Sequence, residues 1–492
     1  MSRLRFATSP SSALKGAETL ILIAPRRTWR KSWCGFLDGK AWLATLEKAI
    51  RNSGTSPAGT ATSTLTGEKV LQRVIAISLP DEVSRHNSPA RHEAALKSLK
   101  RLGLKKSDHV AVIAALDEPG HQIALANAVG RKFCLYSSKT GAGKSGNLSF
   151  AAVDAKGAAL RCSKLTQETV HAARWAAELV DTPTAELSAA DFVRVTKKAL
   201  RGIAGVSVSE IRGNKLLENK LGGLHAVGRC AVVEPRLLLL SFKPKAAKRH
   251  VGLVGKGVVY DTGGLSLKGK MGMPGMKSDM GGAAAVAGAF RALVASGFSD
   301  RLTVAIPLAE NAIGPNAFRN DDIIHMHSGH SVEINNTDAE GRLLLGDGCS
   351  YLARKIKPDL IIDAATLTGA QLVATGYAHA AVVSNREGLE KKAVSAGLAS
   401  GDLVHPLPFA PEFYQSEFSS RVADMRNSVA NRSNAQASCA AQFIYAQIDD
   451  VNIPWLHVDL AGPAFRDGRG TGFGVALLAD LASRIQNSDL KS

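Results

Sequence analysis

The sequence lacks the features that define several common protein classes. None of its apolar runs reaches the roughly 18 residues that a membrane-spanning helix needs. Its six cysteines are scattered without any Cys-x-x-Cys pair, and no His-Glu-x-x-His motif occurs, so the common thiolate and histidine zinc sites are excluded. Without a disulfide spacing pattern, we expect reduced, buried thiols in an intracellular protein.

Acidic residues are few in the N-terminal third. Residues 1–170 contain 26 lysines and arginines against 12 acidic residues, a net charge of +14 out of the +18 of the whole chain. Such a surplus attracts nucleic acid or another polyanion, but it is also typical of a solubilising surface, which we favour. Aromatic residues, only 5% of the chain, do not alternate with the basic ones as they do in proteins that stack single-stranded bases. Nucleic acid is therefore an alternative partner, not the expected one.

No acidic residue precedes Glu18, and the first 17 residues carry Arg3, Arg5, Lys15 and several serines. This composition resembles that of a mitochondrial transit peptide, but the stretch before the first expected strand is short for one. We expect a short disordered tail and a cytoplasmic protein, with mitochondrial import as the alternative.

Strand-like and helix-like segments alternate along the chain, which predicts an α/β protein with a mainly parallel sheet. A stretch rich in Ser, Thr and Gly over residues 53–67 is expected to be a loop. Strands are expected over 18–25, 70–79, 109–115, 132–136, 236–242, 250–254, 303–308 and 360–364, and helices over 41–52, 91–102, 121–129, 190–201, 214–220 and 281–296.

Residues Lys139–Ser145 resemble the end of a phosphate-binding loop. Ser138 stands where the first glycine of that motif belongs, and strand-like sequence follows in place of a helix. We therefore expect a flexible loop.

A long helical pattern over residues 166–180 is broken by the proline-containing turn Asp181–Thr184. We interpret this helix as a connection between domains. The expected division is an N-terminal α/β domain over residues 1–165, a linking helix and turn over 166–185, and a larger domain over 186–492.

The most informative stretch is the octapeptide Asn336-Thr337-Asp338-Ala339-Glu340-Gly341-Arg342-Leu343. In an extended segment, side chains two and four residues apart point the same way, so Asp338, Glu340 and Arg342 would converge. Gly341 frees the backbone before the apolar run Leu343–Leu345, which indicates the start of a buried helix. Taken alone, such a charged triplet is most often a solvated surface.

A second polar cluster lies upstream in glycine-rich sequence and contains Lys256, Asp261, Lys268 and Asp279. Four carboxylates and an amine in one place can hold two divalent cations, because bridging carboxylates offset the repulsion between the ions. An oxygen-rich donor set favours Mn²⁺, Mg²⁺ or exchangeable Zn²⁺ over a tight structural zinc.

Together the two clusters resemble the leucyl aminopeptidase (cytosol aminopeptidase, M17) family of dinuclear metallo-aminopeptidases. The octapeptide is that family's signature, and the upstream Lys, Asp, Lys and Asp follow the family's order without a gap. The resemblance covers about residues 165–485, and the tract Asn316–Phe318 is similar to the aminopeptidase-like branch. It implies a smaller N-terminal α/β domain plus a larger C-terminal α/β catalytic domain with a mixed central sheet flanked by helices.

The resemblance also implies two metal ions per subunit, Mn²⁺ or Zn²⁺, with Co²⁺ and Mg²⁺ as further candidates. Asp261 and Glu340 are implied as ligands of both ions. Lys256 and Asp279 would complete the tighter site, and Asp338 the more exchangeable one. Lys256 would ligate as a neutral amine, which requires a lowered pKa.

For catalysis, the resemblance implies that Lys268 stays charged and stabilises the gem-diolate, and that Arg342 holds a bicarbonate ion as the base. The implied substrates are peptides with a free α-amine and an apolar, leucine-like first residue. Leu367 and Gly369 would offer main-chain hydrogen bonds. The implied substrate-binding residues are Met276, Thr366, Leu367, Gly369, Ala461 and Ala464. The implied assembly is a homohexamer, a dimer of trimers.

Two other functions stay open. The basic N-terminal domain would make the chain a nucleic-acid-associated protein if the peptidase site were secondary. A scaffold without catalysis is a further alternative, against which the complete set of seven metal and catalytic residues argues. We expect a metal-dependent aminopeptidase that attacks the peptide bond with a water activated by two metal ions.

Overall fold

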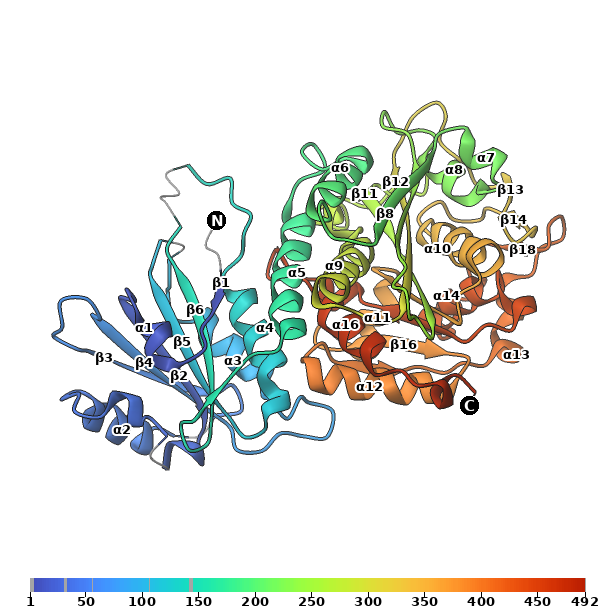
Figure 1. Cartoon of the computed structure of the whole chain (residues 1–492). Coiled ribbons are helices and arrows are strands. Elements are labelled where there is room, and N and C mark those ends of the chain that lie inside the picture. The colour runs from blue at the N-terminus through green and yellow to red at the C-terminus, as the bar shows by residue number, and fades with distance from the viewer. Residues whose placement is uncertain (1–3, 31–32, 55, 106, 141–144, 492) are drawn as a thin grey trace. The chain divides into compact units, whose positions relative to one another are not determined.

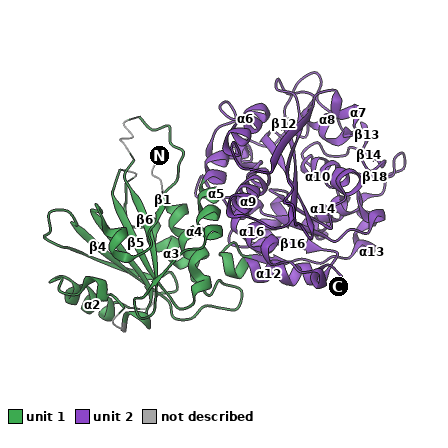
Figure 2. Cartoon of the chain, viewed as in Figure 1, with its two compact units in different colours: residues 1–174, 397–403 green, residues 175–396, 404–492 purple. Residues whose placement is uncertain are grey.

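The computed structural model describes residues 4–30, 33–54, 56–105, 107–140 and 145–491 and divides into two compact units (Figure 2). Unit 1 comprises residues 1–174 and 397–403, and unit 2 comprises residues 175–396 and 404–492. The boundary falls inside helix α5 (Lys164–Asp181), which includes the helix predicted over residues 166–180. The three-part division with borders at 165 and 185 stays a prediction.

A seven-stranded sheet forms the centre of unit 1 (Figure 1). Its strands run in the order β1-β6-β5-β2-β4-β3, and all of these are parallel except the edge strand β3. The short seventh strand, β7, pairs with β6 in the antiparallel direction. Along β2, Ile21 belongs to one hydrophobic core and Leu22 to another, because successive side chains of a strand face opposite sides. The strands are β1 (Leu4–Phe6), β2 (Thr19–Pro25), β3 (Thr60–Leu65), β4 (Arg73–Leu79), β5 (Val110–Leu116), β6 (Leu148–Asp154) and β7 (Ala159–Leu160), and the helices are α1 (Pro10–Leu14), α2 (Leu43–Asn52), α3 (His92–Lys100) and α4 (Gln122–Lys132).

Three expectations for unit 1 are wrong. Residues 4–14 are not a disordered tail, because β1 pairs with β6 and buries Leu4, and Ser9 caps the helix α1. The stretch 53–67 contains β3, an edge strand whose mostly polar residues hide it from a search for apolar runs. Residues 132–136 form the end of α4 and irregular chain in place of a strand. The predicted loop Lys139–Ser145 includes residues 141–144, which lie outside the described residues.

Unit 2 is built on a nine-stranded mixed sheet, which confirms the predicted fold class. Strands β19, β15, β10 and β12 run parallel in the centre, and antiparallel partners flank them, β16 beside β19 and β9 beside β12. The strands are β8 (Val206–Arg212), β9 (Arg236–Phe242), β10 (His250–Gly255), β11 (Gly257–Asp261), β12 (Arg301–Asn311), β15 (Leu360–Ala365), β16 (Ala380–Ser384), β17 (Val404–Pro406) and β19 (Trp455–Asp459). Smaller sheets contain β13 (Ile323–His325), β14 (Ser331–Glu333) and β18 (Met425–Arg426), and β20 (Phe465–Arg466) with β21 (Arg469–Gly470).

Helices cover both faces of the central strands. Figure 1 shows α9 and α16 on one side and α10 and α14 on the other. A methyl group on Gly282 would come within 2.0 Å of the carbonyl oxygen of Ala364, so the small residues of α9 allow it to lie directly against β15. The helices after α5 are α6 (Ala189–Ala199), α7 (Lys215–Glu218), α8 (Gly222–Gly228), α9 (Gly281–Ser296), α10 (Gly341–Tyr351), α11 (Gly369–Thr375), α12 (Glu387–Ser400), α13 (Pro411–Tyr414), α14 (Gln436–Tyr445), α15 (Ala461–Ala464) and α16 (Val475–Arg484).

The structure can be compared with two predictions, one about the cysteines and one about membrane-spanning helices. All six cysteines are free thiols, and Cys34, Cys162, Cys349 and Cys439 are buried, as expected. Among the described residues, no helix combines the length and the apolar character needed to cross a membrane.

Candidate active site

Loops at the carboxyl ends of the central strands enclose a cavity of about 530 Å³, at the edge where open α/β sheets bind ligands. Lys256 follows β10, Asp261 ends β11 and Thr366 follows β15, while Asp279 and Glu340 precede α9 and α10. The predicted site residues that line this cavity are Lys256, Asp261, Lys268, Met276, Asp279, Asp338, Glu340, Arg342, Thr366, Leu367, Gly369 and Ala461. Ala464 is different, because it is buried in α15 and is not part of the lining.

The Lys256 amine lies at the buried end of this cavity. Its Nζ donates to Oδ1 of Asp279 at 2.7 Å and to the carbonyl oxygen of Thr366 at 2.9 Å, and it lies 2.9 Å from Oε1 of Glu340. The hydroxyl of Thr366 donates to the same oxygen of Asp279 at 2.8 Å. A single amine therefore joins the loops that follow β10 and β15 to those that precede α9 and α10.

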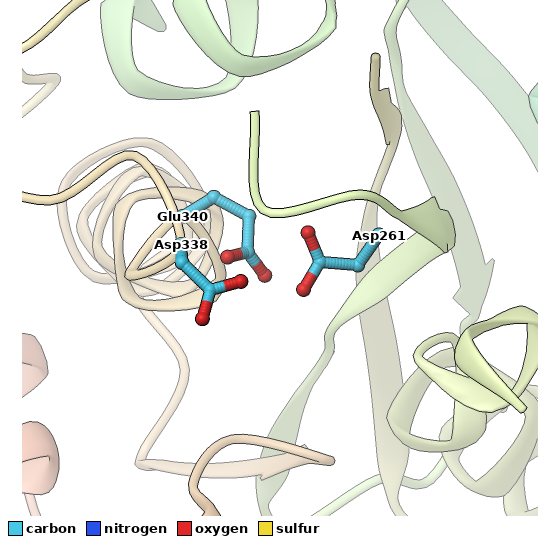
Figure 3. A group of neighbouring side chains, drawn as sticks. All are labelled: Asp261, Asp338 and Glu340. Carbon is cyan, nitrogen blue, oxygen red and sulfur yellow. The ribbon is translucent and has the colours of Figure 1, made fainter. Parts of the chain in front are cut away.

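A second amine joins the remaining carboxylates. Nζ of Lys268 lies 2.8 Å from Oδ2 of Asp261 and donates to Oδ1 of Asp338. Figure 3 shows the carboxylates of Asp261, Asp338 and Glu340 directed toward one another, and one oxygen from each lies within 4.8 Å of the others. Three acids at this spacing repel one another unless positive charge is bound among them.

Burial and charge shift the pKa values of these groups. Burial raises the pKa of Asp279 and of Glu340 above the ordinary range. Burial lowers the pKa of Lys256, but the carboxylates of Asp279, Glu340 and Asp261 raise it by more, so that it lies above its ordinary value. The same balance holds for Lys268. Burial lowers its pKa, but the charges of Asp261 and Glu340 outweigh burial, and its pKa lies above the ordinary value. The surrounding acids thus hold both amines as ammonium groups.

Arg342 reaches the cavity by a route other than the predicted one. Residues 336–340 form a turn and not an extended segment, and α10 begins at Gly341, which places Arg342 in the first turn of a helix. Its Nη1 donates to the carbonyl oxygen of Asn427 at 2.9 Å, while its Nε is buried without a hydrogen-bond partner among the described residues. Burial lowers the pKa of Arg342 to about 10. A buried cation with an unpartnered donor is suited to binding an anion.

Asn311, the last residue of β12, orients Asp261. Its Nδ2 donates to Oδ1 of Asp261 at 2.8 Å and to the carbonyl oxygen of Thr337 at 3.1 Å. The backbone N–H of Gly263 donates to the same carboxylate oxygen at 2.9 Å, and the hydroxyl of Thr337 donates to the carbonyl oxygen of Gly263 at 2.6 Å. Asn311 was not predicted, although its place at the carboxyl end of an apolar strand is a signal that could identify it.

Asp459, at the end of β19, holds the loop that follows β15. Its Oδ1 accepts the backbone N–H groups of Leu367 and Ala461, each at 3.2 Å, and its Oδ2 accepts the hydroxyl of Thr368 at 2.7 Å. Because the N–H of Leu367 is used in this way, its carbonyl oxygen is the main-chain group that it can offer to a ligand. Asp459 was not predicted either.

The donor set fits a pair of divalent cations. Within the cluster itself, four carboxylates are paired with two ammonium groups, which leaves an excess of negative charge there. Oδ2 of Asp279 is buried and has no hydrogen-bond partner among the described residues, which is costly for a carboxylate oxygen unless a cation binds it. Carboxylate oxygens are the ligands that hard cations prefer.

Comparison with known proteins identifies the family. Residues 174–479, more than half of the chain, match the catalytic domain of the cytosol aminopeptidase family. The chain belongs to this family. Residues 41–142 also match the M17 aminopeptidase N-terminal domain 2.

Individual M17 relatives resemble the chain over most of its length. The human probable aminopeptidase NPEPL1 is 45% identical over 421 residues, which are 84% of this chain and 80% of the relative. The solved leucine aminopeptidase of Caenorhabditis elegans is 34% identical with a TM-score of 0.89 over 98% of both chains. The bottromycin maturation enzyme BotP, solved in complex with Mn, is 26% identical with a TM-score of 0.77 over 94% of this chain and 98% of that one.

The resemblance predicted from the octapeptide is confirmed. The chain is an M17 aminopeptidase, a hydrolase of the leucyl aminopeptidase type, in a metal-dependent family.

Proposed function

We propose that this M17 aminopeptidase releases apolar, leucine-like N-terminal residues from peptides, with two divalent metal ions bound among the carboxylates of the cavity. The observation that carries the proposal is that four acids, two lysines and a buried arginine line one cavity of about 530 Å³. A cavity of this size suits the end of a peptide.

Asp261 and Glu340 are proposed to ligate both ions, and Asp338 to complete the more exchangeable site. The close approach of these three carboxylates, within 4.8 Å, supports this assignment. Asp279 and Lys256, whose side chains are 2.7 Å apart, would complete the tighter site. Lys256 ligates only as a neutral amine, so metal binding there releases the proton from its Nζ.

Mn²⁺ or Zn²⁺ is the proposed metal, with Co²⁺ and Mg²⁺ as further candidates. The oxygen-rich donor set and the Mn bound to the relative BotP support Mn²⁺. A pair of such ions supplies Lewis-acid polarisation of a carbonyl and activation of water.

Lys268 is proposed to remain an ammonium group and to donate to the carbonyl oxygen of the scissile bond as that oxygen gains negative charge. The raised pKa of Lys268 beside Asp261 supports this role. Arg342 is proposed to hold a bicarbonate ion as the base, which its buried, unpartnered Nε supports.

One of the two metal ions is proposed to bind the free α-amine of the substrate, which fixes the direction in which a peptide enters. Met276, Thr366 and Ala461 are proposed to contact the first side chain, with Ala464 in the layer behind them. The carbonyl oxygen of Leu367 would accept a hydrogen bond from the peptide. Gly369 would offer another main-chain group, and the space beside its Cα is open, because a Cβ there would meet no atom within 4 Å.

Family membership also leads us to propose a homohexamer, a dimer of trimers, in the cytoplasm, with mitochondria as the alternative compartment. A nucleic-acid role is not proposed, because only the basic surplus of residues 1–170 favours it.

The test is the hydrolysis of leucyl-coumarin by chelator-treated protein to which Mn²⁺, Zn²⁺, Co²⁺ or Mg²⁺ is returned. We expect cleavage that depends on metal, that fails with the N-acetylated substrate and that disappears in a folded Glu340→Ala variant. Absence of turnover with every metal, in folded parent protein, would overturn the proposal.

A further inference from the structure

The cavity contains four cationic side chains, and their surroundings differ. Lys256 and Lys268 are paired with the four carboxylates, and Arg342 is buried and donates to a backbone carbonyl. The fourth cation, Arg432, lines the same cavity on the segment between β18 and α14. Its side chain is exposed, and no ion pair of Arg432 is found in the part of the chain that the structure describes.

The position of Arg432 complements the direction of the peptide. In the proposed function the free α-amine binds at the metal site among the four acids, so the rest of the substrate extends from there into the remaining cavity. Ser428 from the same segment and Gln436, the first residue of α14, line the cavity as well and offer uncharged hydrogen-bonding groups. A wall with a guanidinium, a hydroxyl and an amide is suited to a carboxylate.

We propose that Arg432 makes the enzyme favour substrates that carry a carboxylate on the leaving side of the scissile bond. This inference rests on the proposed function, because it uses the same cavity and the same peptide direction. The carboxylate is either the C-terminus of a dipeptide or the side chain of an acidic second residue. Arg432 acts here in specificity and takes no part in bond cleavage.

Four substrates separate the two sources of the carboxylate. Leu-Ala and Leu-Ala-amide differ only in the terminal carboxylate, and Leu-Glu-amide and Leu-Gln-amide differ only in the side chain. We would measure kcat/KM for each with the metal-loaded full chain and with Arg432→Gln. Arg421→Gln is the matched control, because Arg421 is an exposed arginine of the same region that does not line the cavity.

In at least one of the two pairs, we expect the parent to favour the charged substrate and Arg432→Gln to reduce that preference about 3- to 10-fold, the size of a partly exposed, charge-assisted contact. The loss should lie mainly in KM, because the contact exists before and during the reaction. The preference should also weaken at high salt, and Arg421→Gln should retain it.

Comparing each substrate with its own uncharged partner removes general effects of the substitution on folding or on metal binding. Cleavage of all four substrates with preferences equal in the parent and in Arg432→Gln would overturn the inference and leave the proposed function intact. Cleavage of none of them by the folded, metal-loaded parent would overturn the proposed function itself.

Discussion

Gly341 offers the sharpest test of how the site is built. It is the first residue of α10, where alanine is a better helix former than glycine by about 1 kcal/mol, so local propensity alone predicts that Gly341→Ala is stabilising. The new Cβ, however, would lie 2.5 Å from Cε and 2.7 Å from Nζ of Lys256. Lys256 is buried, so its amine must move by about 1 Å to restore ordinary contact distances.

That displacement weakens the contacts of the amine with Asp279, Glu340 and Thr366. Losing one charge-assisted hydrogen bond costs about 1.5–3 kcal/mol, and about 2.7 kcal/mol corresponds to a 100-fold change in rate. We therefore expect Gly341→Ala to lower kcat/KM on leucyl-coumarin about 10- to 100-fold while the protein stays folded by circular dichroism.

Gly269→Ala is the matched control, because Gly269 lines the same cavity and a Cβ there would meet no atom within 4 Å. It should retain activity within about 3-fold. A folded Gly341→Ala variant with near-parental kcat/KM would refute the reasoning, and so would an equal loss in Gly269→Ala.

Three further substitutions test other contacts of the same unit. Asn311→Asp places a second, buried carboxylate against Asp261, and we expect about a 100-fold loss of kcat/KM together with a lower Tm, because a buried charge without a partner destabilises the fold. Lys268→Gln should lower kcat by about 10²- to 10³-fold with a smaller change in KM, because the ammonium is proposed to contact the developing oxyanion. Asp347→Asn tests pH dependence. Burial raises the pKa of Asp347 to about 7, so its ionisation destabilises the folded state as the pH rises from about 4 toward 7. Asparagine cannot ionise, and the stability of the parent relative to the variant should therefore fall by about 3 kcal/mol between pH 5 and pH 8, measured as a fall in the Tm of the parent relative to the Tm of the variant.

Each of these expectations has a contradicting result. Full activity in Asn311→Asp would show that Asp261 needs no donor from β12. A loss confined to KM in Lys268→Gln would assign that amine to substrate binding. A Tm difference between the parent and Asp347→Asn that stays constant from pH 5 to pH 8 would show that Asp347 does not ionise in this range.

The elements that sequence patterns predicted best are those with long apolar runs. Strand β9 (Arg236–Phe242) and helix α9 (Gly281–Ser296) have their predicted bounds. In α9, Gly297 ends the helix with a φ of 89°, a conformation that glycine adopts without strain. Strand β3 has no such run, because it is an edge strand whose stability comes from backbone pairing with β4.

The acids and lysines of the site could be found because they fall in two short clusters that match a family signature. Asn311 and Asp459 could not, because their function depends on contacts with residues 50 and 92 positions away. Arg342 shows a third limit. Its convergence with Asp338 and Glu340 was predicted from an extended segment. In the structure α10 begins at Gly341, so Arg342 reaches the cavity from a helix.

The most direct test of the account is the number of metal ions that the cavity holds when the enzyme is active. We would titrate chelator-treated protein with Mn²⁺ and measure bound metal by mass spectrometry together with the rate of leucyl-coumarin hydrolysis, in the parent and in a folded Glu340→Ala variant. The account predicts two ions per chain at full activity, and weaker binding with loss of turnover in the variant. Full turnover with no bound metal, or two tightly bound ions in Glu340→Ala, would contradict it.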